Sequence, residues 1–354
     1  MDTLTHALAG ALIARASAPS NAAPDRDAAP GWRLAAGFFA AAFPDADFVL
    51  TLISPDVYLL NHRGATHSVL LLPLWALLLA FVFARLDRGR SDWRSYFGVC
   101  ALGIGSHIAF DLITAFGTMA LWPLTDRRFA LSFTYIIDLF FSGIVLAGLV
   151  ACALWRRSRA PALAALGLLA AYLGLQALLQ SRAAGVGEDY ARAHAIAPAQ
   201  VSAQARPPSP FNWMVVVAQP ERLHYALISL WRDAAPPAPG PDAGFIESLS
   251  APYYPPALAQ WTPATRFGER PQDVALAKQA WEIPGLAFYR WFAEYPVLLR
   301  VDRGNPSTCV WFQDLRFYTP GRGNWPFRFG ACREGGGDWA PSQLLGDGRK
   351  RPLD

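Results

Sequence analysis

The chain has 354 residues, of which 53% are hydrophobic and 16% are charged, and its formal net charge is +4. This charged fraction is well below the roughly 25% of an average soluble domain, so an ordinary soluble protein is excluded. The arginines gather beside apolar stretches, at 85–94 and 156–159. Basic clusters in such places set membrane topology, and we therefore expect no nucleic-acid binding.

The long apolar runs lie in the first half of the chain. Residues 1–180 contain long runs of Ala, Leu, Phe and Val, whereas 181–210 are rich in Ala and Pro. Residues 211–354 contain short segments of β-branched and aromatic residues that are separated by Pro and Gly. We therefore expect a transmembrane helical domain, a linker, and a small soluble α+β domain with an antiparallel sheet.

The first part is predicted to be an all-α membrane bundle. A spanning helix needs about 20 apolar residues. We expect four full spans, at 68–84, 96–118, 134–155 and 161–180. Residues 33–53 are interrupted by Phe-Pro-Asp-Ala-Asp and are expected to form a broken span. Residues 3–16 are too short to cross and suit a half-helix or a re-entrant segment.

The positions of the basic loops predict the orientation. Loops rich in arginine stay in the cytoplasm, which places 85–95 and 156–160 on that side. The C-terminal domain then lies outside the cytoplasm of a multi-pass protein of the bacterial inner membrane. Arg127 and Arg128, in the loop 120–133, would also lie outside, which is a mild conflict with the rule.

Eight histidines and aspartates interrupt or border the apolar segments. Ionisable groups in lipid are costly and therefore indicate function. Imidazoles and carboxylates together are the ligands of hydrolytic metal sites. The predicted orientation brings all of these side chains to one depth near the outer surface. The candidate metal ligands are His6, Asp45, Asp47, His62, His67, His107, Asp111 and Asp138.

The spacing of several candidates favours a common site. His107 and Asp111 are four residues apart, so they share one face of a helix. Asp45 and Asp47 follow Pro44, which breaks the helix and makes an irregular turn that can line a cavity. Each signal alone is weak, because a single membrane histidine is usually structural. It is their combination that predicts a metal site.

The segment His-Arg-Gly-Ala-Thr-His carries two more candidates, His62 and His67, at the outer mouth of a span. Gly64 suits a turn between them. Arg63 is always charged and is expected to hold an anionic group such as a phosphate. For Asp138 three roles stay open: a metal ligand, an acceptor beside a ligand, and a helix-packing partner.

Four motifs in this order resemble a known family. MDTLTHALAG, FPDAD, HRGATHS and HIAFD are similar to segments of the bacterial membrane-bound metal-dependent hydrolases, some of which are labelled LexA-binding, inner membrane-associated hydrolases. The resemblance covers residues 1–180, and HRGATHS is its most specific element. It implies ligands at His6, Asp45, Asp47, His67, His107 and Asp111, with His62 close by. The site also resembles that of zinc-dependent phospholipases C, with no common fold implied.

These patterns predict a metal-dependent hydrolase at the outer face of the inner membrane, with one or two divalent ions, zinc being the expected metal. Such an ion lowers the pKa of bound water to about 7. Asp47 or Asp111 would act as general base, and Arg63 would hold the negative charge of the substrate. A site at bilayer depth favours an amphiphilic ester or phosphoester as substrate.

Two other functions stay open. The first is a non-enzymatic membrane regulator or scaffold with a structural metal, whose C-terminal domain binds a protein partner. The second is a transporter, because broken helices and buried carboxylates also line ion paths. The lack of a second Phe-Pro-Asp-Ala-Asp pattern in the sequence argues against the transporter.

The four cysteines fall into two groups. Cys309 and Cys332 lie on two predicted strands, and outside the cytoplasm they would form a disulfide. Two buried thiols are the alternative. Cys100 and Cys152 lie in predicted spans and are expected to be inert.

Overall fold

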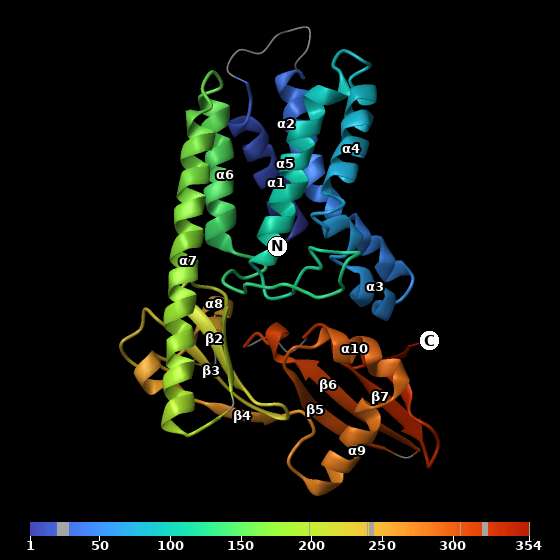
Figure 1. Ribbon diagram of the computed structural model, residues 1–354. Coiled ribbons are helices and arrows are strands. Elements are labelled where there is room, and N and C mark those ends of the chain that lie inside the picture. Colours follow the sequence, from blue (N-terminus) through green and yellow to red (C-terminus); the bar gives the residue numbers. More distant parts are fainter. Residues whose placement is uncertain are drawn as a thin grey trace. The chain divides into compact units, whose positions relative to one another are not determined.

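The chain divides into a helical unit and a sheet unit (Figure 1). The helical unit comprises Met1–Leu50 and Asn61–Leu178, and the sheet unit comprises Thr51–Leu60 and Leu179–Asp354. The computed structural model describes residues 1–19, 28–197, 199–238, 240, 244–304, 306–320 and 325–353. Apolar helices followed by a sheet-containing domain were expected from the sequence, and this order is confirmed.

Most of the membrane-like segments are helices that begin at recognisable residues. They are α1 (Thr3–Ala16), α2 (Pro30–Ala42), α3 (Pro55–Asn61), α4 (Leu72–Leu86), α5 (Trp93–Leu112), α6 (Leu139–Leu154) and α7 (Ala160–Ala193). Asp2 caps α1 by accepting a hydrogen bond from the backbone N–H of Thr5. Pro30 begins α2, where its missing N–H costs no hydrogen bond. The 3₁₀ segments η1 (Phe43–Leu52) and η2 (Ala65–His67) carry the Phe-Pro-Asp-Ala-Asp and Ala-Thr-His sequences.

The number of membrane-spanning helices is lower than the sequence predicted. Among the described residues, three are long and apolar enough to cross: α2 with η1 (Pro30–Leu52), α5 and α7. A fourth span results if Pro55–His67 and Leu72–Leu86, bent by 77°, count as one. Of the four full spans expected, 68–84 is shortened to α4, which starts only at Leu72 after this bend. The segment 134–155 is shortened to α6, because the carboxylate of Asp138 caps the helix there.

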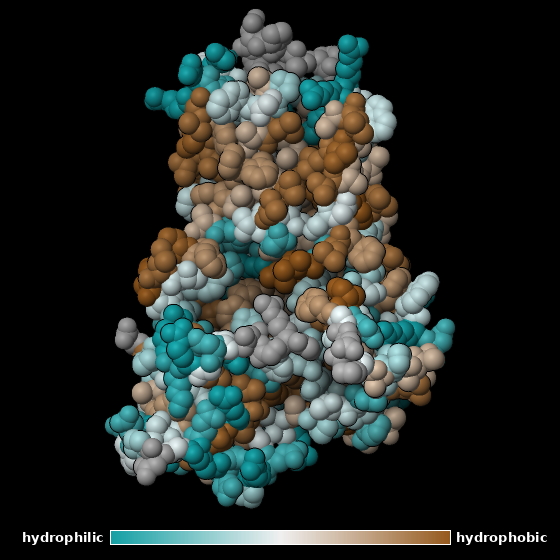
Figure 2. Space-filling model, turned by 180° about the vertical axis from the view of Figure 1, so that it is seen from behind, coloured by the Kyte–Doolittle hydropathy of each residue, from teal (hydrophilic) through white to brown (hydrophobic). Residues whose placement is uncertain are grey.

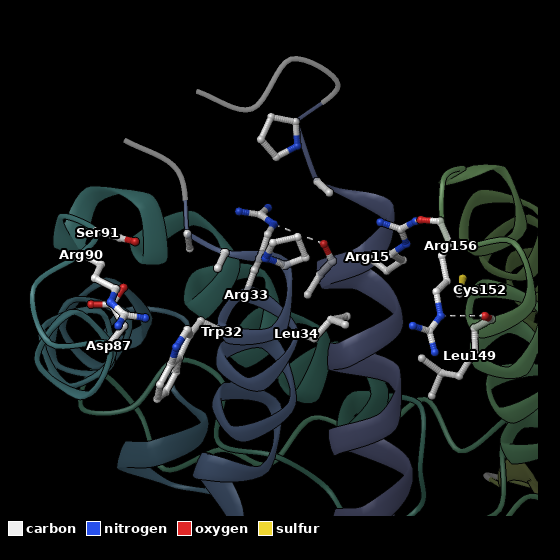
Figure 3. Close-up of a pocket in the computed structure, with 17 residues that line it drawn as sticks. Arg15, Trp32, Arg33, Leu34, Asp87, Arg90, Ser91, Leu149, Cys152 and Arg156 are labelled. Carbon is white, nitrogen blue, oxygen red and sulfur yellow. Dashed lines mark hydrogen bonds between the residues drawn. The ribbon is translucent and has the colours of Figure 1, made fainter. Parts of the chain in front are cut away.

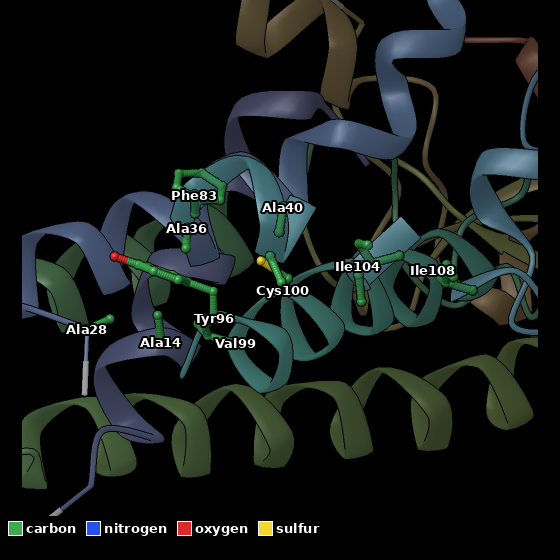
Figure 4. Packing of buried hydrophobic residues seen from close by; sticks show 12 residues of the cluster. Ala14, Ala28, Ala36, Ala40, Phe83, Tyr96, Val99, Cys100, Ile104 and Ile108 are labelled. Atoms are coloured by element: carbon green, nitrogen blue, oxygen red, sulfur yellow. The ribbon is translucent and has the colours of Figure 1, made fainter. Parts of the chain in front are cut away.

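Glycines let the backbones of α1, α2 and α5 come into direct contact. A Cβ atom on Gly10 would lie 2.3 Å from the carbonyl oxygen of Gly37, and one on Gly103 would lie 3.1 Å from the same oxygen. Small residues of this kind are typical of helix contacts in membranes. Around them, alanines such as Ala36 and Ala40 pack against the buried Tyr96 (Figure 4). This contact fixes α1 and α5, which carry His6, His107 and Asp111, and α2, which leads directly into η1 with Asp45 and Asp47.

The outer surface of the helical unit is apolar. Figure 2 shows apolar side chains gathered in a band over this unit, with hydrophilic residues at its end. Large exposed side chains contribute to this surface, among them Leu74, Leu78, Phe81, Val150 and Leu168. An exposed apolar surface of this extent suits contact with lipid rather than water.

The sheet unit contains two antiparallel sheets in which sequence neighbours pair. The first is β1 (Gln200–Ala205), β2 (Asn212–Ala218), β3 (Arg222–Ser229) and β4 (Thr262–Thr265). The second is β5 (Pro296–Arg303), β6 (Ser307–Asp314), β7 (Phe329–Glu334), β8 (Ala340–Leu344) and β9 (Lys350–Pro352). The helices α8 (Phe245–Ser250), α9 (Pro271–Trp281) and α10 (Ala287–Phe292) lie between its strands in the sequence, and most of α3 and the end of α7 also belong to this unit. One core joins the sheets, because Met214 and Val216 of β2 pack in a cluster with Tyr295 and Val297.

A disulfide links Cys309 and Cys332 across the second sheet. The two cysteines lie opposite one another on the neighbouring strands β6 and β7. Of the two alternatives that the sequence left open, the structure therefore has the disulfide. Cys100 and Cys152 are free and buried in the helical unit.

Candidate metal centre

Four acidic and imidazole side chains converge inside the helical unit. Asp45 lies in η1, His67 ends η2, and His107 and Asp111 lie one turn apart on α5. One ligand atom from each lies within 4.8 Å of the others, so the four could hold a metal ion. Three of the side chains are fully buried, while Asp45 keeps 13% of its side chain exposed. The cluster is therefore accessible only at its Asp45 side.

The distances within this cluster are those of ligands that share one ion. The Nε2 atom of His67 lies 3.2 Å from Asp111 Oδ2 and 3.7 Å from Asp45 Oδ1. The Nε2 atom of His107 lies 3.4 Å and 3.5 Å from the same two oxygens. Ligand atoms bonded to one tetrahedral zinc ion are about 3.3 Å apart. The spacing thus fits an ion at the centre of the four atoms.

A backbone carbonyl fixes the tautomer of His107. Its Nδ1 atom lies 2.6 Å from the carbonyl oxygen of Ala41, at the end of α2. A carbonyl can only accept, so Nδ1 carries the proton and donates it. The lone pair of Nε2 then faces the cluster. A donated hydrogen bond of this kind, from the ring nitrogen that is not bound, is usual for histidines that bind metal.

His67 is fixed in the same way by its neighbour Thr66. The Thr66 hydroxyl donates to Asp47 Oδ2 at 3.1 Å, and it accepts from His67 Nδ1 at 3.0 Å. His67 therefore also turns the lone pair of its Nε2 atom toward the centre. This Nε2 atom lies 3.0 Å from Nε2 of His107. Asp111 Oδ2 is buried and has no hydrogen-bond partner. Lone pairs and carboxylates that face each other repel, and a cation relieves this repulsion.

Each carboxylate of the cluster uses its second oxygen elsewhere. Asp45 Oδ2 accepts from the Thr3 hydroxyl at 2.5 Å. Asp111 Oδ1 pairs with Arg63 Nη2 at 2.7 Å and also contacts the amino group of Met1. Both carboxylates consequently present one oxygen to the centre, which suits an ion of low coordination number.

His6 lies beside the four-atom cluster. Its Nε2 atom lies 3.1 Å from Asp111 Oδ1, the oxygen that points away from the centre. Its ring stacks on that of His107 with 3.7 Å between the ring centroids. The sequence predicted His6 as a ligand, and in the structure it lies outside the four-atom group and contacts two of its members, Asp111 and His107.

Asp47 and His62, two further predicted ligands, bind one another. Asp47 Oδ1 lies 2.7 Å from His62 Nδ1, and Asp47 Oδ2 accepts from the backbone N–H of Arg63 at 3.0 Å. Arg63 has a φ of 63°, which a non-glycine residue adopts only when held in place. The Asp47 carboxylate thus holds the turn that delivers His67 to the cluster.

Arg63 lies beside the cluster. Its side chain is almost fully buried, and Nη1 donates to the Thr114 hydroxyl at 3.0 Å and to the Asp111 carbonyl oxygen at 3.4 Å. Its guanidinium also lies 4.9 Å from the centre of the Phe116 ring. In the structure Arg63 is thus paired with Asp111 and positions this carboxylate, and its role in holding an anionic substrate stays a prediction.

Asp138 belongs to helix α6 and lies outside the four-residue cluster. Its Oδ1 atom accepts from the backbone N–H groups of Phe140 and Phe141, each at 3.0 Å. Its Oδ2 atom accepts from the Tyr172 hydroxyl at 2.7 Å. Of the three roles that the sequence left open for Asp138, the structure shows the packing partner. An aspartate directly before an apolar run is the usual sign of such a cap.

Sequence reasoning missed two groups that orient the ligands. Thr3 stands within MDTLTH, but nothing in the sequence pairs it with Asp45, which is 42 residues away. The Ala41 carbonyl carries no side-chain signal at all, and it reaches His107 only because α2 and α5 touch at their glycines.

Comparison with known proteins places the helical part of the chain. Residues 1–183 match the YdjM inner membrane protein family. The chain belongs to this family. All four residues of the cluster lie in the matched range, and the match agrees with the expected membrane protein. It carries no statement about hydrolase activity.

One curated relative extends the comparison. The uncharacterized protein YfhP of Bacillus subtilis (strain 168) is 27% identical over 185 residues, which are 51% of this chain and 55% of YfhP. The chain thus spans about half the length of the curated relative that it matches. No solved structure matches the chain significantly.

Proposed function

We propose that this member of the YdjM family is a metal-dependent hydrolase that acts on an amphiphilic ester or phosphoester at the membrane. The observation that carries the proposal is the convergence of four possible ligand atoms, one from each side chain, within 4.8 Å of one another. Nε2 of His67 and of His107 would hold the ion together with one oxygen each from Asp45 and Asp111. Two imidazoles and two carboxylate oxygens favour zinc over calcium or magnesium, which prefer six or more oxygen ligands.

When bound, a divalent ion supplies Lewis-acid polarisation of the scissile group and lowers the pKa of a water molecule. The chain supplies a base next to it. Because the Asp47 carboxylate can only accept, His62 Nδ1 carries the proton, which leaves Nε2 as the basic nitrogen. The rings of His62 and His67 are 5.8 Å apart. In this proposal Asp47 orients His62, and His62 takes the proton from the attacking water.

The position of the site supports the amphiphilic substrate class. The cluster lies in the part of the chain that matches an inner membrane protein family, and Asp45 is its least buried member. A substrate that already resides in the bilayer would reach such a site without leaving the lipid. The polar headgroup of such a substrate would then carry the ester or phosphoester.

The disulfide supports the proposed orientation of the sheet unit. Disulfides persist outside the cytoplasm and are rare within it. The Cys309–Cys332 bond therefore agrees with the arginine-rich loops in placing this unit outside the cytoplasm. A membrane-impermeant protease added to intact cells should cut the sheet unit, and protection from the protease would contradict this orientation.

A structural role of the metal is the second candidate, and the cluster itself favours it in one respect. Four protein ligands fill a tetrahedral shell, which is typical of structural zinc sites, whereas catalytic sites keep one position open. A scaffold of this kind would bind metal but turn over no substrate. X-ray absorption spectroscopy on the purified protein would count the ligands and show whether water occupies one position.

The test of the proposed function combines metal content with turnover. Purified full-length protein should contain about one zinc ion per chain, and His67→Ala and Asp111→Ala should lose it. Asp138→Asn is the matched control, because it removes a buried carboxylate charge outside the cluster. In mixed micelles with phospholipid and lipid phosphomonoester, His62→Gln should retain metal but lose turnover by roughly 100-fold or more. Unchanged metal content in His67→Ala would contradict the site, and metal without turnover would favour the scaffold.

A further inference from the structure

A cavity of about 860 Å³ opens in the helical unit at the ends of α1 and α6, the start of α2 and the turn after α4 (Figure 3). None of the candidate metal ligands lines it. It lies at the C-terminal end of α1, while His6 lies in the first turn of that helix. Nine residues separate His6 from Arg15, which amounts to about 14 Å along a helix. The cavity is therefore a site distinct from the metal centre.

Guanidinium groups surround this cavity. Arg15, Arg33, Arg90 and Arg156 line it, with Asp87 as the acidic member of the lining. Asp87 is buried, and its Oδ2 atom accepts from the Tyr96 hydroxyl at 2.6 Å. Among the described residues that line the cavity, the positive charge therefore exceeds the negative charge.

Bonds to backbone carbonyl oxygens hold two of the arginines at the cavity. Arg15 Nη2 donates to the carbonyl oxygen of Ser158 at 3.0 Å, and Arg33 Nη2 donates to that of Ser17 at 2.9 Å. Within the described parts of the chain, no carboxylate forms an ion pair with Arg15, Arg90 or Arg156. Guanidinium groups bind phosphate oxygens in a bidentate manner, so an anionic phosphate is the complementary group.

The other wall of the cavity is apolar. Trp32 and Leu34 at the start of α2 and Leu149 at the end of α6 line it, and Ala153 lies one turn further along α6 (Figure 3). A free phosphate ion would leave this surface uncovered. A molecule with an anionic head and a hydrocarbon chain would cover both surfaces at once.

We propose that this cavity binds an anionic phospholipid, with the headgroup phosphate on the neighbouring Arg15 and Arg156 and an acyl chain along Leu149 and Ala153 of α6. Basic pockets between membrane helices are suited to such headgroups, since each arginine near an anionic lipid contributes about 1 kcal/mol. The site is independent of the proposed hydrolase activity. It requires no metal and uses none of the residues of the metal centre.

The test measures the lipid that stays with the protein. Full-length protein is reconstituted in vesicles of phosphatidylcholine with a minority of phosphatidylglycerol, extracted in mild detergent, and analysed by native mass spectrometry. Arg156 is exposed and Arg15 is partly exposed, so the double variant R15Q/R156Q should fold. It should retain at least about tenfold less phosphatidylglycerol than the unmodified chain. R157Q/R159Q is the matched control, because it removes the same charge from the turn after α6 at residues that do not line the cavity.

A second variant tests the apolar wall without altering charge. Ala153→Trp fills this wall and should also displace phosphatidylglycerol, whereas Val150→Trp, outside the lining, should not. The proposal is overturned if R157Q/R159Q loses as much lipid as R15Q/R156Q, or if phosphatidylcholine is retained equally well. It is also overturned if inorganic phosphate displaces the lipid while Ala153→Trp has no effect, because the site would then be one for free phosphate.

Discussion

The Nε2 atoms of His67 and His107 face each other at 3.0 Å, and in the neutral rings neither carries a proton. The proton of each ring lies on Nδ1, held by Thr66 in one case and by the Ala41 carbonyl in the other. Two imidazole lone pairs at this distance repel each other, and a cation between them would relieve this repulsion. Groups outside the cluster thus set the tautomers of both histidines, so changes to those groups should alter metal binding.

Thr66→Val should weaken metal binding, because valine fills the same space but offers no acceptor to His67 Nδ1. Loss of such an outer contact typically lowers metal affinity by roughly 10- to 100-fold. Competition with a chromophoric zinc chelator would measure the change. Thr66→Ser keeps the hydroxyl and should bind like the unmodified protein, and equal affinities for the Val and Ser variants would rule out the hydroxyl as the cause.

Arg63→Gln should act on the metal and not on the substrate. Glutamine cannot balance the charge of Asp111, so metal affinity should fall by roughly 10- to 100-fold. With saturating zinc, KM for an anionic substrate should change little. The opposite pattern, normal affinity for zinc with a raised KM, would return Arg63 to the role that the sequence predicted.

Gly10→Ala should destabilise the helical unit by roughly 1–3 kcal/mol, because overpacking forces the helices apart. The new Cβ atom would lie 2.3 Å from the Gly37 carbonyl oxygen. Gly143→Ala on α6 is the matched control, since no atom lies within 4 Å of its new Cβ. Thermal unfolding in detergent should show a lower Tm for Gly10→Ala alone, and a similar fall in both variants would argue against the close contact.

Cys309→Ser should lower the stability of the sheet unit. The disulfide closes a loop with a sequence separation of 23 residues, for which chain entropy gives about 3 kcal/mol. Denaturant unfolding followed by tryptophan fluorescence would measure the loss. The variant Cys152→Ser removes a free thiol from the helical unit and should leave this transition unchanged.

The sheet unit should also lose stability in mild acid through His224. Burial lowers the pKa of His224 below 6.5, and the nearby His194 and Arg222 lower it further. Below pH 6.5 the unfolded chain therefore binds the proton more readily, so stability falls as the pH drops from 6.5 through the folded pKa. The neutral ring accepts from the Tyr190 hydroxyl at 3.0 Å, which a protonated ring cannot do. The effect stays below about 1 kcal/mol, because water screens a partly exposed ring.

Thermal unfolding at pH 5.5 and pH 7.5 would measure this difference. The variant His224→Gln cannot titrate and should show a smaller pH effect than the unmodified chain. An equal pH effect in both proteins would assign the acid sensitivity to other groups.

The sequence predicted the elements better than the arrangement of the site. A spacing of four residues places His107 and Asp111 on one helix face, and in the structure an atom of each belongs to the same cluster. Which candidates share that cluster depends on contacts between distant segments, such as Arg63 with Asp111 and Ala41 with His107. No local pattern encodes these pairs.

Span lengths were overestimated for a related reason. Apolar runs continue past the ends of α4 and α6, but the helices begin only where a cap or a bend allows. Asp138 caps α6, and the chain bends by 77° before α4. Hydrophobicity alone marks where lipid is tolerated, whereas capping groups decide where a helix starts.

The glycine contact of α1, α2 and α5 has a consequence for how this protein can diverge. Because the backbones touch directly, the coordinates of Asp45, His107 and Asp111 are set by main-chain packing rather than by side-chain choice. The lipid-facing surface can then change residue by residue without moving the centre. A lineage could keep the same inner geometry while its exterior adapts to membranes of different thickness or composition.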